Sequence, residues 1–190
     1  MNRRQAISSV ALLLGGTIIG GEIFALTGCK SAPTQVNDLF TTDDVALLDE
    51  IAETIIPETN TPGAKAAETG AFMTVMVKDC YTAEDQQVFI KGLKDVNDKA
   101  QKNYSANFVD LKPKEKEELL NKLDVEQSEF QKSKEKGEPS HYFRMMKELT
   151  MLGFFTSEVG GTKVLTYLEV PGRYDACIDY KKGDPVYLSI

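Results

Sequence analysis

The stretch Thr41–Pro57, TTDDVALLDEIAETIIP, carries the first clear helix signal of the mature chain. The hydroxyls and carboxylates at its start can cap exposed N–H groups and favour the positive end of a helix dipole. Apolar residues then recur at helical spacing, at Val45, Leu48, Ala52, Ile55 and Ile56. Pro57 ends the pattern, because its ring disfavours helical geometry in the residue before it. We therefore predict an amphipathic helix with one buried face.

The segment that follows predicts a stiff connector and then a second helix. The connector has prolines at positions 57 and 62, with Thr and Asn between them. Thr61 is a suitable N-cap and Pro62 suits the first helical position, so the helix would run to about Cys80. Its inward-facing residues are expected to be Ala67, Ala71, Val75 and Met76.

Two more helices follow, each with its own start signal. Residues 82–85, TAED, form a capping box. The buried stripe of the helix after it is expected at Val88, Phe89, Leu93, Val96 and Ala100. Pro113 opens a short fourth helix with apolar residues at Leu119, Leu120 and Leu123. Residues 126–138 are almost entirely polar, so they form either a solvated loop or an extension of that helix.

The last part of the chain combines a helix with an irregular tail. A fifth helix is expected from about Ser140 to Phe155, lined by Tyr142, Met145, Met146, Leu149 and Leu152. A short sixth helix would run through residues 165–168, before a turn at Pro171-Gly172. The tail after residue 179 is non-helical, with one short edge strand at 186–188. Residues 39–190 thus predict an all-α fold, a compact single-domain bundle of about five to six helices with an irregular C-terminal tail.

The N-terminus reads as an export signal over residues 1–28. Arg3 and Arg4 precede an uncharged apolar run, which is the layout of a signal peptide, and the arginine pair suggests the twin-arginine route for folded proteins. Residues 26–29, LTGC, resemble a lipobox in which Cys29 receives lipid. The alternative is an uncleaved membrane helix, but Glu22 inside it would cost roughly 2.5 kcal/mol or more. We expect a lipoprotein on the periplasmic side of the cell envelope, with residues 29–38 as a tether.

Charge and cysteine content narrow the function classes. The formal net charge is -7, and removing the signal makes the chain more acidic. That balance argues against nucleic-acid binding, which needs a basic footprint. With Cys29 assigned to lipid, Cys80 and Cys177 remain in an oxidising compartment. They are either joined in a disulfide or present as two buried free thiols, and the sequence leaves both open.

A search for catalytic groups finds no assembled motif. His141 is the only histidine, at the start of a helix, and we expect it to be structural or exposed. The sequence has no nucleophile elbow, phosphate loop or dinucleotide fingerprint. An enzyme using His141 with a nearby carboxylate is the weaker alternative. The aromatic residues near 154–174 belong either to the core or to a protein interface, which also uses such residues.

Three segments and the Arg3-Arg4 signal resemble the gluconate 2-dehydrogenase subunit 3 family. Residues 55–64, IIPETNTPGA, are similar to its IPxTDTPGA segment, with Asn60 in place of Asp. Residues 152–158, LGFFTSE, resemble its GYFTSE-like segment. Residues 171–177, PGRYDAC, resemble its PGxYxGC segment, with Ala176 where Gly is usual.

The resemblance implies a function that the residues alone do not. The family is the small subunit of membrane-bound dehydrogenases whose large subunit is a glucose-methanol-choline-type flavoprotein. That subunit holds FAD and oxidises a sugar or sugar acid, and a cytochrome c subunit often takes the electrons. The small subunit is implied to be non-catalytic and without a cofactor, and to stabilise and co-export its partner. Its partner interface is expected among Pro57, Thr61, Pro62, Gly63, Phe154, Phe155, Glu158, Pro171, Gly172 and Tyr174.

A different class of function stays open beside this one. The chain could be a free-standing envelope lipoprotein that binds a small ligand or a scaffold partner in a cavity between helices. A neighbouring gene for a flavoprotein without its own signal peptide would favour the subunit over that alternative.

Overall fold

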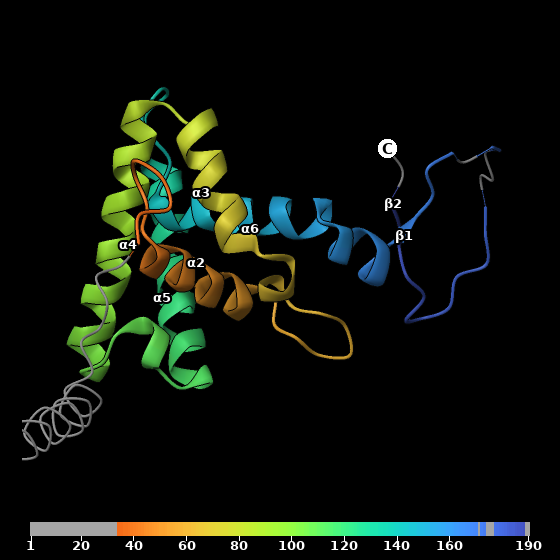
Figure 1. The fold of residues 1–190 in the computed structure, drawn as a ribbon, viewed down its shortest axis with the longest axis horizontal. Coiled ribbons are helices and arrows are strands. Elements are labelled where there is room, and N and C mark those ends of the chain that lie inside the picture. Colours follow the sequence, from red (N-terminus) through yellow and green to blue (C-terminus); the bar gives the residue numbers. More distant parts are fainter. Residues whose placement is uncertain (1–33, 171, 174–176, 189–190) are drawn as a thin grey trace, which may run out of the picture. The chain divides into compact units, whose positions relative to one another are not determined.

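The computed structural model describes residues 34–170, 172–173 and 177–188 (Figure 1). Residues 35–190 form one unit, and the description below concerns that unit. The expected signal and anchor residues Arg3, Arg4 and Cys29 lie outside the described residues, as do Pro171 and Tyr174. In the described part of the chain, no helix is both long and apolar enough to cross a membrane.

The first described helix, α2 (Thr42–Ile55), begins and ends where its sequence signals stand. Asp44 N–H donates to the Thr41 hydroxyl at 3.3 Å, and Thr41 N–H donates to the Asp44 carboxylate at 2.8 Å. This reciprocal capping satisfies N–H groups that have no partner inside the helix. The buried face comprises Leu47, Leu48, Ile51 and Ala52. Residues 35–38, which we expected in the tether, already fold back on this unit, because Gln35 pairs with Thr41 in a backbone bridge.

The second predicted helix is wrong in its start and only partly right in its buried face, since Ala67 and Met76 are half-buried against the core. A 3-10 turn, η1 (Ala64–Ala67), is followed by α3 (Thr69–Cys80), so Thr61 caps neither. Glu68 separates the two in a left-handed conformation with φ 50°, which rotates the helix relative to the expected register. The buried residues are therefore Thr69, Gly70, Met73, Thr74 and Val77, whereas Val75 is 54% exposed.

The helices α4 (Ala83–Tyr104) and α5 (Pro113–Ser133) are joined by the 3-10 turn η2 (Phe108–Asp110). The Thr82 hydroxyl caps α4 by accepting from Asp85 N–H at 3.2 Å, and the expected stripe is buried apart from half-buried Val88. At 21 residues, α5 is longer than the short helix predicted from its leucines. The polar segment after residue 126 continues it to Ser133, and residues 134–138 then form a loop, so each of the two expected alternatives holds for part of the segment.

The chain ends with α6 (Tyr142–Thr156), the π-helical turn η3 (Gly160–Val164) and two strands. The sixth helix expected at 165–168 is wrong: strand β1 (Thr166–Tyr167) lies there and pairs in parallel with β2 (Tyr187–Leu188). The edge strand near the C-terminus is thus confirmed. Leu152, expected on the buried side of α6, is 44% exposed.

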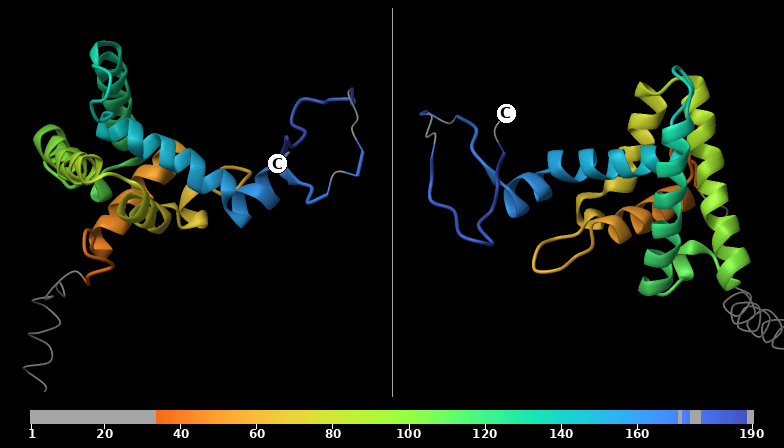
Figure 2. Two further views of the ribbon diagram at one scale, coloured as in Figure 1. Left: turned by 90° about the horizontal axis from the view of Figure 1, so that it is seen from above. Right: turned by 180° about the vertical axis from the view of Figure 1, so that it is seen from behind.

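The helices pack around a core rich in phenylalanine, which confirms the all-α class. In two views α6 crosses the upper half of α4 and α5 steeply and reaches from there towards the strands (Figures 1 and 2). Glycines permit the closest crossings: a Cβ at Gly153 of α6 would lie 2.6 Å from the Phe72 ring of α3. The largest fully buried rings belong to Phe40, Phe89, Phe108, Phe143 and Phe154.

Candidate partner interface

The loop between α2 and η1 is exposed yet firmly held at its base. Pro57 and Thr61 are exposed and Pro62 is half-buried. The Glu53 carboxylate accepts from Glu58 N–H at 2.7 Å and from Lys65 N–H at 2.8 Å. Ala64 N–H also donates to the Ile56 carbonyl at 2.9 Å. Residues 57–62 therefore form a projecting loop of fixed shape (Figure 1).

Gly63 shapes this loop from inside and is not an exposed contact. It is buried, and a Cβ at this position would lie within 3.0 Å of both Glu53 carboxylate oxygens and of Glu58 N. A residue of this size is required because the backbone and the carboxylate approach each other so closely.

The end of α6 divides the predicted interface residues between core and surface. Phe154 is 1% exposed and belongs to the core, so its placement in the interface is corrected. Phe155 is half-buried, packs edge-on against Phe154 at 5.2 Å and is followed by exposed Glu158. The Ser157 hydroxyl donates to the Phe154 carbonyl at 2.7 Å and accepts from Gly160 N–H at 3.0 Å, which fixes the exit of the helix.

The structure brings the loop and the end of α6 to the same part of the molecule. Buried Thr69 links them: its hydroxyl donates to the Ala64 carbonyl at 2.7 Å, while its methyl group lies 3.2 Å from the position of a Cβ on Gly153. The loop and the end of α6 are about 90 residues apart in sequence and are neighbours in the structure. The exposed side chains of Met151 and Leu152 lie on α6 beside them.

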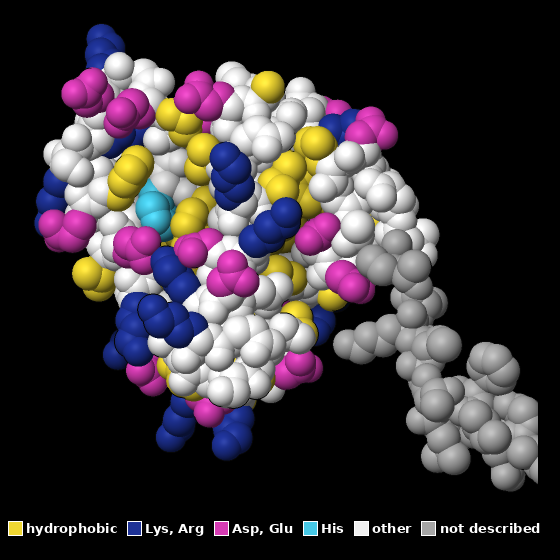
Figure 3. Space-filling view, turned by 90° about the vertical axis from the view of Figure 1, so that its left-hand side faces the viewer, with side chains coloured by type: hydrophobic (Ala, Val, Ile, Leu, Met, Phe, Trp, Pro, Cys, Tyr) yellow, Lys and Arg dark blue, Asp and Glu magenta, His cyan; other side chains and the backbone are white. Residues whose placement is uncertain are grey.

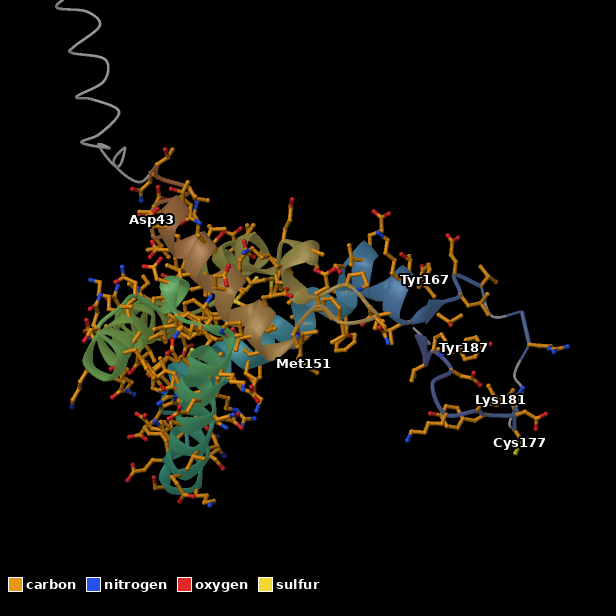
Figure 4. The ribbon with its side chains drawn as sticks, turned by 90° about the horizontal axis from the view of Figure 1, so that it is seen from below. Asp43, Met151, Tyr167, Cys177, Lys181 and Tyr187 are labelled. Carbon is orange, nitrogen blue, oxygen red and sulfur yellow. The ribbon has the colours of Figure 1, made fainter. Side chains whose placement is uncertain are left out.

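The segment from Leu165 to Leu188, which we call the C-terminal arm, has no buried residue among those whose burial is described. Figure 4 shows its described parts beyond the end of α6, with Tyr167 and Tyr187 close to that helix and Cys177 and Lys181 farther from it. Thr166 N–H donates to the Val186 carbonyl at 2.9 Å. Gly172 is exposed on this arm. Seven of its apolar side chains are 46% to 77% exposed, at Tyr167, Leu168, Val170, Ile178, Tyr180, Val186 and Tyr187.

Most of these exposed residues of the arm were not predicted from the sequence. They follow neither the period of a helix nor that of a long strand, so no pattern marked a buried face. The usable signal was their density in a segment interrupted by Pro and Gly, without a predicted element to bury them.

Cys80 and Cys177 are both free and exposed, so the structure has neither a disulfide between them nor the burial expected of free thiols. The topology supplies the reason. Cys80 ends α3, whose beginning at Thr69 lies beside Gly153 near the end of α6. Cys177 lies on the arm, which follows the end of α6. The arm therefore leaves the helices near the start of α3, whereas Cys80 is at its other end. A disulfide requires Cα atoms no more than about 7 Å apart.

A cleft of about 630 Å³ lies between α2, α5 and α6, next to Pro57. The lysines on its walls are paired with acids: Lys116 with Glu50 at 2.8 Å and Lys147 with Asp124 at 2.6 Å. Burial raises the pKa of Glu50, but hydrogen bonds from Lys116 and Lys65 outweigh it and leave that pKa below its ordinary value. These ion pairs join the three helices. In the described ranges, no group of three or more His, Cys, Asp or Glu side chains could hold a metal ion.

His141 sits at the N-cap of α6 in a network of polar groups. Its Nδ1 accepts from Phe143 N–H at 3.2 Å, and its Nε2 lies 3.6 Å from a Glu126 carboxylate oxygen. Burial lowers the pKa of His141 below 6.5, partly countered by Glu126. The imidazole thus caps the start of α6 and lies beside an acid.

Tyr142 and Lys99 continue the same network. The Tyr142 hydroxyl donates to Asp95, and Lys99 pairs with Asp95 at 2.8 Å and with Glu126 at 2.7 Å. Burial, followed by the bond to Asp95, raises the pKa of the Tyr142 phenol, so it stays protonated. The network joins α4, α5 and α6.

The fold and the exposed arm define an all-α protein whose apolar surface is suited to assembly with another chain. Comparison with known families makes this specific. The model of the family Gluconate 2-dehydrogenase subunit 3 matches residues 42–172, from the first turn of α2 to the arm. The chain therefore belongs to this family, an accessory subunit of a dehydrogenase complex, as its resemblance implied. Neither a curated protein nor a solved structure shows significant similarity to the chain.

Proposed function

We propose that this protein is the non-catalytic small subunit of a membrane-associated, FAD-dependent dehydrogenase of the glucose-methanol-choline type. Its partner is the flavoprotein that oxidises a sugar or sugar acid and holds the FAD. The small subunit stabilises this partner and is exported with it. Family membership supports the association with dehydrogenase subunits, and the identity of the partner is the step we add.

The observation that carries the proposal is the exposed C-terminal arm. Its only described strand pairing involves two residues on each side, Thr166–Tyr167 with Tyr187–Leu188. An isolated pair of strands is at best marginally stable in water. Contiguous exposed apolar surface marks interaction sites in soluble proteins. Full burial of one large apolar side chain contributes roughly 1.5–3 kcal/mol, so a partner that covers several of them would hold the arm firmly.

The projecting loop and the end of α6 extend the proposed surface. Pro57, Thr61 and Glu158 are exposed there, beside half-buried Pro62 and Phe155. The loop has a fixed shape before any partner arrives, because Glu53 holds both of its ends. A preformed contact of this kind loses little entropy on binding. We infer that the loop fixes the position of the partner on the proposed surface, while the arm provides most of the apolar area that the partner buries.

Export and anchoring complete the proposal. Arg3 and Arg4 would direct the folded pair through the twin-arginine route, which suits a flavoprotein that has already bound FAD. Lipid on Cys29 would then hold the complex at the periplasmic side of a membrane. A cytochrome c subunit as electron acceptor is part of the same proposal.

Co-purification from membranes tests this function. The full chain, tagged at its C-terminus, is expressed in its native host and extracted in detergent. We expect it to bring down one flavoprotein with stoichiometric FAD and sugar or sugar-acid dehydrogenase activity. Recovery of the protein alone, in extracts where the flavoprotein is present, would instead support a free-standing lipoprotein.

A paired variant sharpens the result. Ile178→Asp with Tyr180→Asp places two charges on the arm, where both native side chains are at least 60% exposed. We expect the unfolding temperature of the isolated protein to stay the same and the recovered flavoprotein to fall at least tenfold. The matched control is Lys181→Gln with Lys182→Gln, which shifts the net charge of the same arm equally and spares its apolar residues.

A further inference from the structure

A second hollow lies at the other end of the helices, away from the arm. It has a volume of about 510 Å³ and is bounded by the start of α4, the end of α5 and the segment leading into α6. Its lining comprises Glu84, Val88, Phe130, Glu138, Pro139, Ser140, His141 and Tyr142. Figure 3 shows the histidine on this face, with hydrophobic and acidic side chains around it. The volume is in the range of small-molecule sites.

Three aromatic rings from two different elements form one wall of this hollow. His141 stacks on Tyr142 with ring centres 4.3 Å apart, and Phe130 of α5 lies 5.6 Å from His141. Phe130 is 39% exposed, so part of its ring faces solvent. Val88 and Pro139 add aliphatic surface.

The wall is held in place before any ligand binds. The Tyr142 ring packs where a Cβ on Gly92 would stand, and its hydroxyl is bound by Asp95. His141 is fixed by the bond that its Nδ1 accepts from Phe143 N–H at 3.2 Å. Because Nδ1 is an acceptor, the imidazole proton of the neutral ring is on Nε2, which points towards Glu126.

The ionisable lining of the hollow is acidic. Glu84 and Glu138 lie on its rim and are both exposed. The nearby ammonium of Lys99 is already bound by Asp95 at 2.8 Å and Glu126 at 2.7 Å. Burial keeps the pKa of His141 below 6.5, so the ring adds no charge at neutral pH. A cation entering the hollow would meet carboxylates on the rim and the partly exposed ring of Phe130.

We propose that this hollow binds a small organic ammonium ion, with the cation against the Phe130 ring and near the carboxylates of Glu84 and Glu138. Aromatic faces attract such cations through their quadrupoles, most strongly where water is excluded. The carbon groups of the ligand would cover Val88 and Pro139. The site is independent of the proposed partner surface.

Choline is the probe that tests the site, because a neutral compound of nearly the same shape, 3,3-dimethylbutan-1-ol, provides the matched ligand control. The single histidine of the chain makes its ring signals an unambiguous reporter in proton NMR. We expect choline to shift these signals in a saturable way. We expect the neutral compound to bind at least tenfold more weakly. Equal binding of both compounds, or no saturable shift with choline, would overturn the proposal.

Variants separate the aromatic and acidic contributions. Phe130→Leu keeps an apolar side chain but removes the ring, and should weaken choline binding about fivefold, as expected for one partly desolvated cation–π contact. Glu84→Gln with Glu138→Gln should weaken it as well, while the control Glu118→Gln, on α5 outside the hollow, should not. Thermal unfolding verifies that each variant is folded. An unchanged affinity in both site variants, with choline still bound, would overturn the assignment to this hollow.

One further measurement decides whether the bound cation is a small molecule or a protein side chain. The same ammonium chemistry is found in a free amine and in a lysine side chain of another protein. A blocked lysine amide that binds while choline does not would overturn the small-ligand assignment in favour of a protein side chain.

Discussion

The Glu53 carboxylate and the backbone of Gly63 lie in direct contact, and this contact closes the loop between α2 and η1. A Cβ on residue 63 would stand within 3.0 Å of both carboxylate oxygens. The same two oxygens accept from Glu58 N–H at 2.7 Å and from Lys65 N–H at 2.8 Å. One side chain of α2 therefore holds both ends of a loop that is exposed in between, and only glycine lets it approach.

Gly63→Ala should push the carboxylate away and release the loop. We expect the free energy of unfolding to fall by about 1–3 kcal/mol, the usual cost of forcing a methyl group into a filled site. Urea denaturation measures this change. The control is Gly161→Ala, where a Cβ would meet no atom within 4 Å. Equal losses in both variants would show that the contact with Glu53 is not the cause.

The same substitution should also affect partner binding. If the loop sets the register of the proposed interface, Gly63→Ala should lower the yield of co-purified flavoprotein even at a temperature where the variant is folded. A normal yield from a destabilised variant would confine the role of Glu53 and Gly63 to stability.

Much of the helical fold follows from short-range signals in the sequence. The Thr41–Asp44 capping box marks the start of α2, and Thr82 marks the start of α4. These caps act within one turn of the chain, so neighbouring residues suffice to predict them. The buried stripe of α4 follows from apolar periodicity for the same reason.

Other features depend on packing and were not predictable from local patterns. Glu68 adopts a left-handed conformation that non-glycine residues rarely choose, and the register of α3 depends on it. The Asp49 carboxylate accepts from Gly70 N–H at 2.7 Å and so fixes the start of α3 from another helix. The residues around position 68 do not indicate this contact, because Asp49 lies on another helix, α2.

The candidate interface was only partly predictable for a related reason. The family-like segments indicated the loop and the end of α6, but residues close together in the sequence there differ in burial. Phe154 is buried and Leu152 is exposed, because the contact of Gly153 with Phe72 decides which side of α6 faces inward. The apolar residues of the arm follow no periodic pattern. Their exposure is visible only in the structure, where the helices form the core without them.

Tyr142→Phe tests the network that joins α4 and α6. The hydroxyl donates to Asp95 and accepts from Lys99 at 3.2 Å, while Asp95 keeps its ion pair with Lys99. We expect a loss of about 1.5–3 kcal/mol in the free energy of unfolding, the net value of a hydrogen bond to a charged group. Tyr187→Phe, on the exposed arm, should change it by less than about 0.5 kcal/mol. Similar losses in both would argue against the network.

His141 should make stability depend on pH. Burial lowers its pKa in the folded protein below the ordinary value of 6.5, although Glu126 opposes the shift. The unfolded chain therefore takes up the proton first as pH falls. The contribution is fully present above pH 6.5 and is lost as pH falls through 6.5 towards the folded-state pKa. Urea denaturation over this window should show a declining free energy of unfolding.

His141→Asn is the matched variant for this effect. Asparagine keeps an acceptor at the helix N-cap but does not titrate. Its free energy of unfolding should decline less between pH 7 and the folded-state pKa than that of the native protein, and NMR titration of the native ring gives that pKa directly. A ring pKa at or above 6.5 would contradict the expected direction.

Phe154 and Leu152 provide the sharpest separation of core from interface, because they lie two residues apart on α6. Phe154 is 1% exposed, so Phe154→Ala should cost about 3–5 kcal/mol through the lost burial and the cavity that remains. Leu152 is 44% exposed, so Leu152→Ala should change the free energy of unfolding by no more than about 0.5 kcal/mol. If α6 contacts the flavoprotein, Leu152→Ala should nevertheless reduce co-purification several-fold at full stability. A variant that is stable and still binds normally would move the interface away from this face of α6 and leave the C-terminal arm as its principal part.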